Sequence, residues 1–185
     1  MPHRKRIVLI PAPSIRIGSV ADAQTVAALA IQVFLDTYAT EGVRPDLANE
    51  AFAEYGCGNF AQRLAEKGRV FYLAEQGSGL VGFAEVLRNQ QPSPIIGVGG
   101  SELIRLYVQP QAQDVGTGLA LLKRAEQCSL EAGTSGVWLS AWEHNLKARA
   151  FYKRQNYKDV GYAPYVILGQ SYGNRIFFRS TEGEA

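Results

Sequence analysis

The segment Glu102–Leu119, ELIRLYVQPQAQDVGTGL, places an apolar strand, a polar loop and the first turn of a helix in direct succession. The strand pattern ends at Val108, and an amphipathic pattern typical of a helix runs over 117–132. Gly116 and Gly118 therefore stand where a loop opens a helix. Unpaired backbone N–H groups and the positive end of the helix dipole favour an anion such as a phosphate at that point.

Two familiar nucleotide-binding patterns fail at this glycine pair. A dinucleotide fingerprint, GxGxxG, needs a third glycine where this chain has Leu121. A P-loop needs a lysine directly after its last glycine, and neither Gly116 nor Gly118 is followed by one. Because a lone GxG is more often a plain tight turn than a ligand site, the surrounding sequence has to decide between the two interpretations.

The elements predicted on either side of this segment alternate between strands and helices. Strands are expected at 14–17, 69–76, 80–88, 102–108, 137–142, 162–168 and 175–179, and helices at 22–39, 45–66, 117–132 and 145–155. The second helix is interrupted at 56–58, and 89–100, with two prolines and three glycines, is expected to be a loop.

The resulting order, β-αα-βββ-α-β-α-ββ, predicts an α/β (α+β) fold with a mixed central sheet of about six or seven strands and about four flanking helices. Residues 1–185 are expected to form one domain, with an N-terminal extension at 1–13 and a polar tail at 181–185.

Composition excludes several classes of protein. The 185 residues are 46% hydrophobic and 19% charged, which is typical of a globular chain, and no apolar run is long enough to span a membrane. A net charge of +2 gives no support for nucleic-acid binding. Cys57 and Cys128 are far apart and form no CxxC pattern, so neither a disulfide framework nor a metal site is expected. We therefore expect a cytoplasmic protein without a metal.

Two motifs carry a resemblance to a known family. The spacing Val108-x-Pro110-x-x-Gln113-x-x-Gly116-x-Gly118 resembles the acetyl-CoA-binding segment of the GNAT superfamily of N-acetyltransferases, whose core is (Q/R)xxGx(G/A). The later segment 142–152, WEHNLKARAFY, resembles the second segment of the superfamily, roughly WExNxxAxxFY. The likeness covers residues 14–180. The segments 34–38, 137–142 and 168–172 are also similar to the PaiA-type branch, whose members acetylate polyamines and related amines.

Two positions depart from the family pattern. The helix that carries the second motif ends at Asn156-Tyr157, where the family usually has a glycine before the aromatic residue. Asparagine tolerates the left-handed conformation that such a helix end requires. Asp114 follows Gln113, where most members have a basic residue or glycine, and an acid there is unfavourable beside a pyrophosphate unless it points away.

The resemblance implies acetyl-CoA as the co-substrate. The pantetheine arm would lie along Leu106, Tyr107 and Val108 like an added strand, and the Val108 N–H would act as an oxyanion donor. The pyrophosphate would lie on backbone N–H groups, with help from the Gln113 side chain; these are the N–H groups of Asp114, Val115, Gly116, Thr117, Gly118 and Leu119. Asn145 is expected to cap the following helix and also to contact the cofactor.

The same resemblance implies the catalytic groups. Tyr152 is the candidate acid for the leaving thiolate, since its reference pKa of about 10 is near that of an alkyl thiol; a tyrosine at this helical spacing could instead be a plain core residue. Glu102 is the first candidate base, on one face of its strand with Val108 unless a bulge breaks the alternation. Glu85 on the preceding strand, or a chain of waters, is the alternative.

The acceptor is expected to be a small molecule with a primary amine, with a polyamine as the example that the narrower resemblance suggests. Asp36, Glu41, Glu50 and Glu54 could supply negative charge to it. Two other functions stay open: acetylation of a protein N-terminus or lysine, and a non-catalytic acyl-CoA-binding regulator. Trp138 and Trp142 are expected to be core residues. The resemblance also allows a homodimer through the C-terminal strands.

Overall fold

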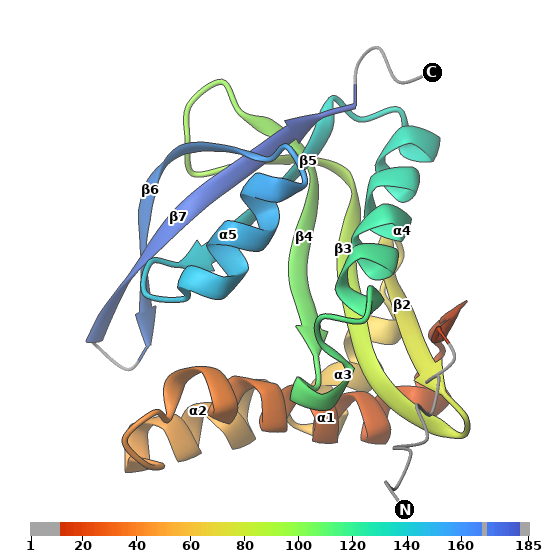
Figure 1. The fold of residues 1–185 in the computed structure, drawn as a ribbon, viewed down its shortest axis with the longest axis vertical. Coiled ribbons are helices and arrows are strands. Elements are labelled where there is room, and N and C mark those ends of the chain that lie inside the picture. The colour runs from red at the N-terminus through yellow and green to blue at the C-terminus, as the bar shows by residue number, and fades with distance from the viewer. Residues whose placement is uncertain (1–11, 168–169, 182–185) are drawn as a thin grey trace, which may run out of the picture.

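The computed structural model describes residues 12–167 and 170–181, so the expected extension and tail lie almost wholly outside the described residues. The elements, shown in Figure 1, are β1 (Ser14–Ile17), α1 (Ala23–Tyr38), α2 (Pro45–Glu54), α3 (Cys57–Ala65), β2 (Arg69–Gln76), β3 (Gly79–Pro92), β4 (Gly99–Val108), α4 (Thr117–Ala132), β5 (Gly136–Trp142), α5 (Leu146–Arg154), β6 (Lys158–Ile167) and β7 (Gln170–Ser180). This order matches the predicted one. The second helical stretch is divided into α2 and α3 by a break at residues 55–56, slightly before the interruption expected at 56–58.

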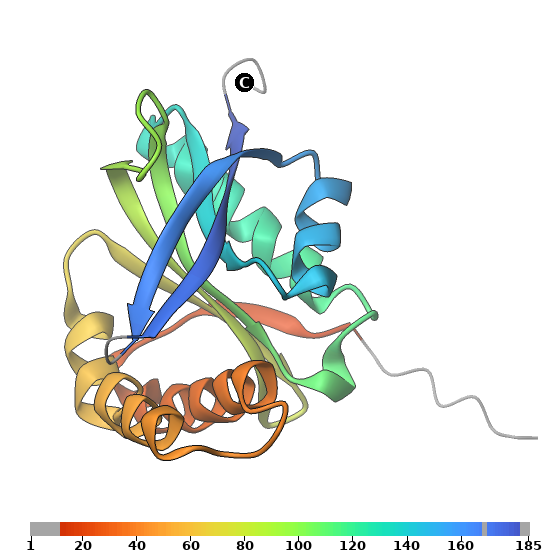
Figure 2. The same ribbon diagram turned by 90° about the vertical axis from the view of Figure 1, so that its left-hand side faces the viewer.

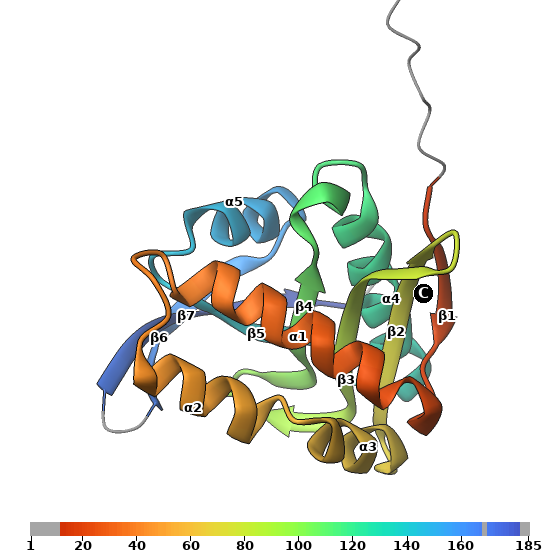
Figure 3. The same ribbon diagram turned by 90° about the horizontal axis from the view of Figure 1, so that it is seen from below.

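The strands form one seven-stranded mixed sheet in the order β1-β2-β3-β4-β5-β7-β6. Every neighbouring pair is antiparallel except β4 and β5. Side chains of the strands alternate between two cores, one shared with α1, α2 and α3 and one shared with α4 and α5. Viewed from below, α1, α2 and α3 lie together across one face of the sheet (Figure 3). The fold class is therefore confirmed.

The expected loop at 89–100 is wrong for half of its length. β3 continues to Pro92 and β4 begins at Gly99, so only six residues, 93–98, connect the two strands. Gly100, one of the glycines that indicated a loop, is required by packing instead. A Cβ on it would lie 2.2 Å from the carbonyl oxygen of Gly136. The glycine therefore permits a close approach of β4 to β5, which the composition of the segment does not distinguish from a turn. β6 likewise begins at Lys158, before the expected residue 162.

β4 and β5 pair only at their first residues, through Ser101 with Val137 and Glu102 with Trp138. Figure 1 shows the two strands close together at that end and apart at the other. The separation leaves the last residues of β4 without a strand neighbour on the β5 side. Within the described ranges, no helix is long and apolar enough to cross a membrane.

Candidate active site

The end of β4 presents a backbone donor toward the space that β5 leaves. The N–H of Gln109 donates to the carbonyl oxygen of Val81 on β3 at 2.9 Å. Because successive N–H groups of a strand point to opposite sides, the N–H of Val108 points away from β3, toward the side from which β5 has diverged. Leu106 and Val108 share the core of α4 and α5, whereas the Tyr107 side chain lies on the opposite face.

The loop after β4 ends in an exposed helix start. Gly116 is the N-cap of α4 at φ 92°, a left-handed conformation that favours glycine. The first helical hydrogen bond runs from the Ala120 N–H to the Gly116 carbonyl at 2.9 Å, so the N–H groups of Thr117, Gly118 and Leu119 have no partner within the helix. The Thr117 hydroxyl is buried and has no hydrogen-bond partner. This unpaired set of donors fits an anionic diphosphate.

Three polar side chains connect this loop to α5. The Gln113 amide nitrogen donates to the Val108 carbonyl at 3.0 Å, and its amide oxygen accepts from Lys147 Nζ at 2.8 Å. Asp114 has φ 59° and points outward, where it forms an ion pair with Lys147 at 2.9 Å. The acid is thus exposed, and its charge is paired with that of Lys147. Asn145 caps α5 as expected, its side-chain oxygen accepting the Ala148 N–H at 3.0 Å.

Tyr152 lies on the side of the sheet that α4 and α5 cover. Its side chain is 8% exposed, and its ring packs 5.8 Å from Phe177 and 5.9 Å from Tyr157. Burial, and to a lesser degree the nearby Tyr107 hydroxyl, raise the pKa of Tyr152 above its ordinary value. The hydroxyl therefore stays protonated over the whole neutral range, as a proton donor must.

Glu102 and Val108 do not share a face of β4. Leu103 is opposite Val86 and Arg105 is opposite Glu85, so Ile104 is the extra residue of a β-bulge. The bulge places Glu102 on the same face as Arg105 and Tyr107, toward α1, α2 and α3. Burial, with help from Glu85, raises the pKa of the half-buried Glu102 carboxyl, although Arg69 and Arg105 oppose that shift. A carboxylate with a raised pKa is a better base than an ordinary glutamate.

The alternative candidate base, Glu85, is fully buried, and both of its carboxylate oxygens accept hydrogen bonds from arginines. One carboxylate oxygen accepts from Arg69, and the other accepts from Arg105 Nη1 at 2.5 Å. With both carboxylate oxygens bound by guanidinium groups and no exposed surface, Glu85 is not directed at an acceptor. Of the two candidate carboxylates, Glu102 is the one that forms no ion pair with any residue in the described part of the chain.

The acids expected to meet the acceptor divide into two kinds. Glu54 accepts from Arg63 at 2.6 Å and from Arg105 at 2.7 Å, so its negative charge is already paired with arginines of the protein. Asp36 and Glu41 are exposed. Glu50 is half-buried on α2, and burial together with Glu54 raises the pKa of its carboxyl. Of the four, only Glu50 combines partial burial with a carboxylate that no described arginine binds.

An aromatic cluster brings together the end of α1, the end of β5 and the start of β7. The rings of Tyr38 on α1 and Trp142 on β5 lie 5.1 Å apart, and Tyr172 on β7 lies 6.0 Å from the first and 6.4 Å from the second. The Tyr172 hydroxyl also accepts from Arg44 at 3.2 Å. Trp142 is thus only partly a core residue. The segments that end in Tyr38, Trp142 and Tyr172 entered the sequence analysis only as a resemblance. The contact of Tyr172 with Arg44 was not predicted, since their 128-residue separation carries no local signal.

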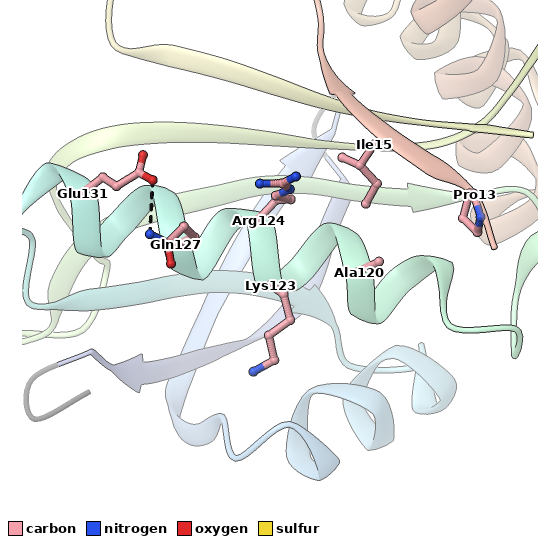
Figure 4. Close-up of a pocket in the computed structure, with 7 residues that line it drawn as sticks. All are labelled: Pro13, Ile15, Ala120, Lys123, Arg124, Gln127 and Glu131. Carbon is pink, nitrogen blue, oxygen red and sulfur yellow. Dashed lines mark hydrogen bonds between the residues drawn. The ribbon is translucent and has the colours of Figure 1, made fainter. Parts of the chain in front are cut away.

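A pocket with basic residues in its lining lies apart from Gly116 and Gly118. It runs between β1 and the middle of α4 (Figure 4), lined by Pro13, Ile15, Ala120, Lys123, Arg124, Gln127 and Glu131. In Figure 4 the Lys123 side chain turns away from β1, and its ammonium binds Glu126 at 2.8 Å. The pocket therefore adds no residue to the site at the start of α4. No group of three or more potential metal ligands occurs in the described part of the chain.

Comparison with known proteins agrees with this geometry. The family model of the acetyltransferase (GNAT) family matches residues 32–157. An uncharacterized N-acetyltransferase of Lactobacillus delbrueckii subsp. lactis is 26% identical over 125 residues, covering 68% of this chain and 72% of that protein.

Two crystal structures show the same fold. A GCN5-related N-acetyltransferase from Rhodopseudomonas palustris superposes with a TM-score of 0.70 at 20% identity, covering 93% of this chain and 98% of that one. The PaiA N-acetyltransferase from Thermoplasma acidophilum, in complex with coenzyme A, gives 0.65 at 21% identity, covering 88% and 98%.

The sheet opens between two parallel strands, beside a helix start whose backbone N–H groups can hold a diphosphate, and the family match explains this arrangement. The chain belongs to the acetyltransferase (GNAT) family and is an acetyl-CoA-dependent N-acetyltransferase. The likeness to the PaiA protein is one of fold, since the identity is too low to carry its substrate to this chain.

Proposed function

We propose that this enzyme acetylates a primary amine of a small molecule, with a polyamine or short diamine as the acceptor class. The observation that carries the proposal is a bridge between the α1–α2 connection and the β6–β7 hairpin, across the side where we place the acceptor. Arg44, in the connection between α1 and α2, binds Tyr172 on β7 at 3.2 Å, and Tyr172 contacts Tyr38. A peptide acceptor would need an open groove between these elements, whereas a small amine needs only an enclosed space. Figure 2 shows the β6–β7 hairpin reaching toward the helices.

Each proposed residue has one role in the transfer. Bound acetyl-CoA supplies a thioester whose carbonyl carbon the amine nitrogen attacks while the bond to sulfur breaks. The Val108 N–H donates to the carbonyl oxygen and stabilises the negative charge that develops there. Glu102 accepts the proton that the amine loses, directly or through water, and Tyr152 donates its hydroxyl proton to the departing sulfur.

The cofactor would be held by the groups that the structure brings together at the end of β4 and the start of α4. The pantetheine arm would follow the backbone of Leu106–Val108, and the diphosphate would meet the N–H groups of 114–119. The Thr117 hydroxyl and the Asn145 amide are further donors there. Gln113 is best seen as a brace of the loop, because its side chain already joins Val108 to Lys147.

An acceptor panel tests the proposal directly. The purified enzyme is given acetyl-CoA with a monoamine, several diamines, spermidine or a short peptide, and free thiol release is followed. We expect the highest kcat/KM with a diamine or spermidine. A clear preference for the peptide would show a protein acetyltransferase, and binding of acetyl-CoA without turnover on any amine would show a regulator.

Replacing Gly116 with alanine should weaken acetyl-CoA binding. An L-residue at φ 92° is strained by about 1–2 kcal/mol, and relaxing that strain moves the N–H groups that face the diphosphate. We expect Kd, measured by titration calorimetry with coenzyme A, to rise about tenfold. Gly77 is the matched control: it has φ 61° and open space around it, so Gly77→Ala should cost similar stability and leave Kd unchanged. Equal affinity in both variants would contradict the assignment.

Glu50 should matter for a second positive charge on the acceptor. We expect Glu50→Gln to raise KM for a diamine about fivefold and to leave KM for a monoamine unchanged, since an interaction of about 1 kcal/mol with the distal ammonium is lost. The exposed Glu41 provides the control substitution, Glu41→Gln, which should change neither value. If both substrates respond alike to Glu50→Gln, this residue does not bind the distal amine.

A further inference from the structure

The face of the sheet that carries Glu102 also carries an ionic network around the fully buried Glu85. Three arginines alternate with three glutamates: Arg69 binds Glu66 and Glu85, Arg105 binds Glu85 and Glu54, and Arg63 binds Glu54. Arg105 lies also above the rings of Tyr55 and Phe60, with its guanidinium carbon 5.2 Å and 5.9 Å from the ring centres. The positive and negative charges of these six groups balance without Glu102.

Glu102 is therefore the carboxylate in excess. It forms no ion pair with any residue in the described part of the chain, although the guanidinium groups of Arg69 and Arg105 are close enough to influence it. Both arginines are instead directed at Glu85, which is fully buried between them. The strand register and the bulge place Glu102 on the same face as both arginines. A guanidinium group that lost Glu85 could therefore bind Glu102 instead.

We propose that Glu85 is a positioning residue: by binding Arg69 and Arg105 it keeps both guanidinium groups away from Glu102 and leaves that carboxylate unpaired to accept a proton. The inference rests on the proposed role of Glu102 as base. Burying an ion pair is costly in itself, so this arrangement has no evident advantage for stability alone. It has an advantage for a base, which loses strength once it is paired with a cation.

Removing an acidic neighbour of Glu102 and removing a basic one should shift the pKa of Glu102 in opposite directions, given the charged groups around it. They are Arg69 on β2, Glu85 on β3, Arg105 on β4, Glu50 and Glu54 on α2, and Arg63 and Glu66 on or next to α3; the β5 neighbour, Trp138, does not titrate. Glu85→Gln removes a negative charge and releases two positive ones, and both effects lower the pKa of Glu102. Arg69→Gln removes a positive charge and raises it.

The test measures the ionisation of Glu102 in two ways. Glutamates labelled with ¹³C at the carboxyl carbon are titrated by NMR in the free enzyme, with the Glu102 signal assigned from Glu102→Gln. The acid limb of kcat/KM against pH is recorded for the same proteins. We expect both readouts to move down by about one pH unit in Glu85→Gln and up in Arg69→Gln. Glu85→Asp, which keeps the charge, should restore most of the original value.

A matched control separates positioning from loss of stability. Glu126 on α4 is also a buried carboxylate bound by two cations, Lys123 at 2.8 Å and Arg179 at 2.7 Å, but it lies on the other side of the sheet. Glu126→Gln should destabilise the fold and leave both readouts in place.

Two outcomes would contradict the inference, and they are distinguishable. If Glu85→Gln and Arg69→Gln leave the Glu102 titration unmoved, or shift it in the same direction, Glu85 has only a structural role and the proposed function is unaffected. If Glu102→Gln keeps the acid limb, Glu102 is not the base and the underlying assignment fails. If Glu85→Gln does not fold, Arg69→Gln still tests the inference. Arg69 lies toward the end of the network, where it also binds Glu66, and its loss should raise the pKa of Glu102.

Discussion

Tyr152→Phe should lower kcat by about 10²–10³-fold and leave the affinity for acetyl-CoA unchanged, because a general acid contributes about that much to a transfer step. The substitution removes one oxygen from a ring packed against Phe177 and Tyr157, so the packing is kept. The leaving thiolate then departs without its proton donor. Steady-state kinetics with the best amine of the panel, together with calorimetry for coenzyme A, measure the two quantities separately.

The neighbouring tyrosine is the control for this prediction. Tyr157 is equally buried, lies 5.9 Å from Tyr152 between ring centres, and loses the same atom in Tyr157→Phe. That variant should keep kcat within about twofold, since its hydroxyl has no role in the proposed transfer. The pH profile adds a second check: burial raises the pKa of Tyr152, so activity should not fall on the alkaline side up to about pH 10, the ordinary tyrosine pKa. Unchanged turnover in Tyr152→Phe would show that sulfur leaves unassisted.

Local patterns explain why much of the fold could be predicted. Alternation predicts the strands, helical periodicity predicts α4, and the glycines at 116 and 118 mark the loop that opens it. The Asn145 cap and the helix end at Asn156, observed at φ 63°, are also local features that residue type alone indicates. Each of these depends on residues within a few positions of one another.

The features that escaped prediction depend on pairing between distant segments. Leu103 and Ile104 are both apolar, so nothing in their order shows that Ile104 is the extra residue of a bulge; only the register with β3 does. The bulge decides on which face Glu102 lies. The full length of the β3–β4 hairpin was missed for a similar reason, because Gly100 serves a close approach to β5 rather than a turn. The network around Glu85 draws on five elements, β2, β3, β4, α2 and α3, and no spacing along the chain reveals it.

Replacing Glu102 with glutamine should reduce kcat/KM at pH 7.5 by about 100-fold, the contribution expected of a general base. An aliphatic amine with a pKa of about 10 is about one part in a thousand neutral at pH 7, so reaching the reactive form costs about 4 kcal/mol. Glu102 can accept that proton because burial raises the pKa of its carboxyl toward the working range. The glutamine variant keeps the size of the side chain and removes only this capacity.

The direction of the pH dependence follows from the same shift. A raised pKa means that the carboxylate form is lost at a higher pH than for an ordinary glutamate, whose pKa is about 4.3, so wild-type kcat/KM should fall on the acid side from above that value. In Glu102→Gln this limb should disappear, and the remaining activity should rise steadily with pH as more amine becomes neutral. Glu75→Gln, which removes a surface carboxylate paired with Arg16, should keep the wild-type profile. If Glu102→Gln also keeps it, a water chain that ends elsewhere carries the proton, and the raised pKa of Glu102 reflects only its burial.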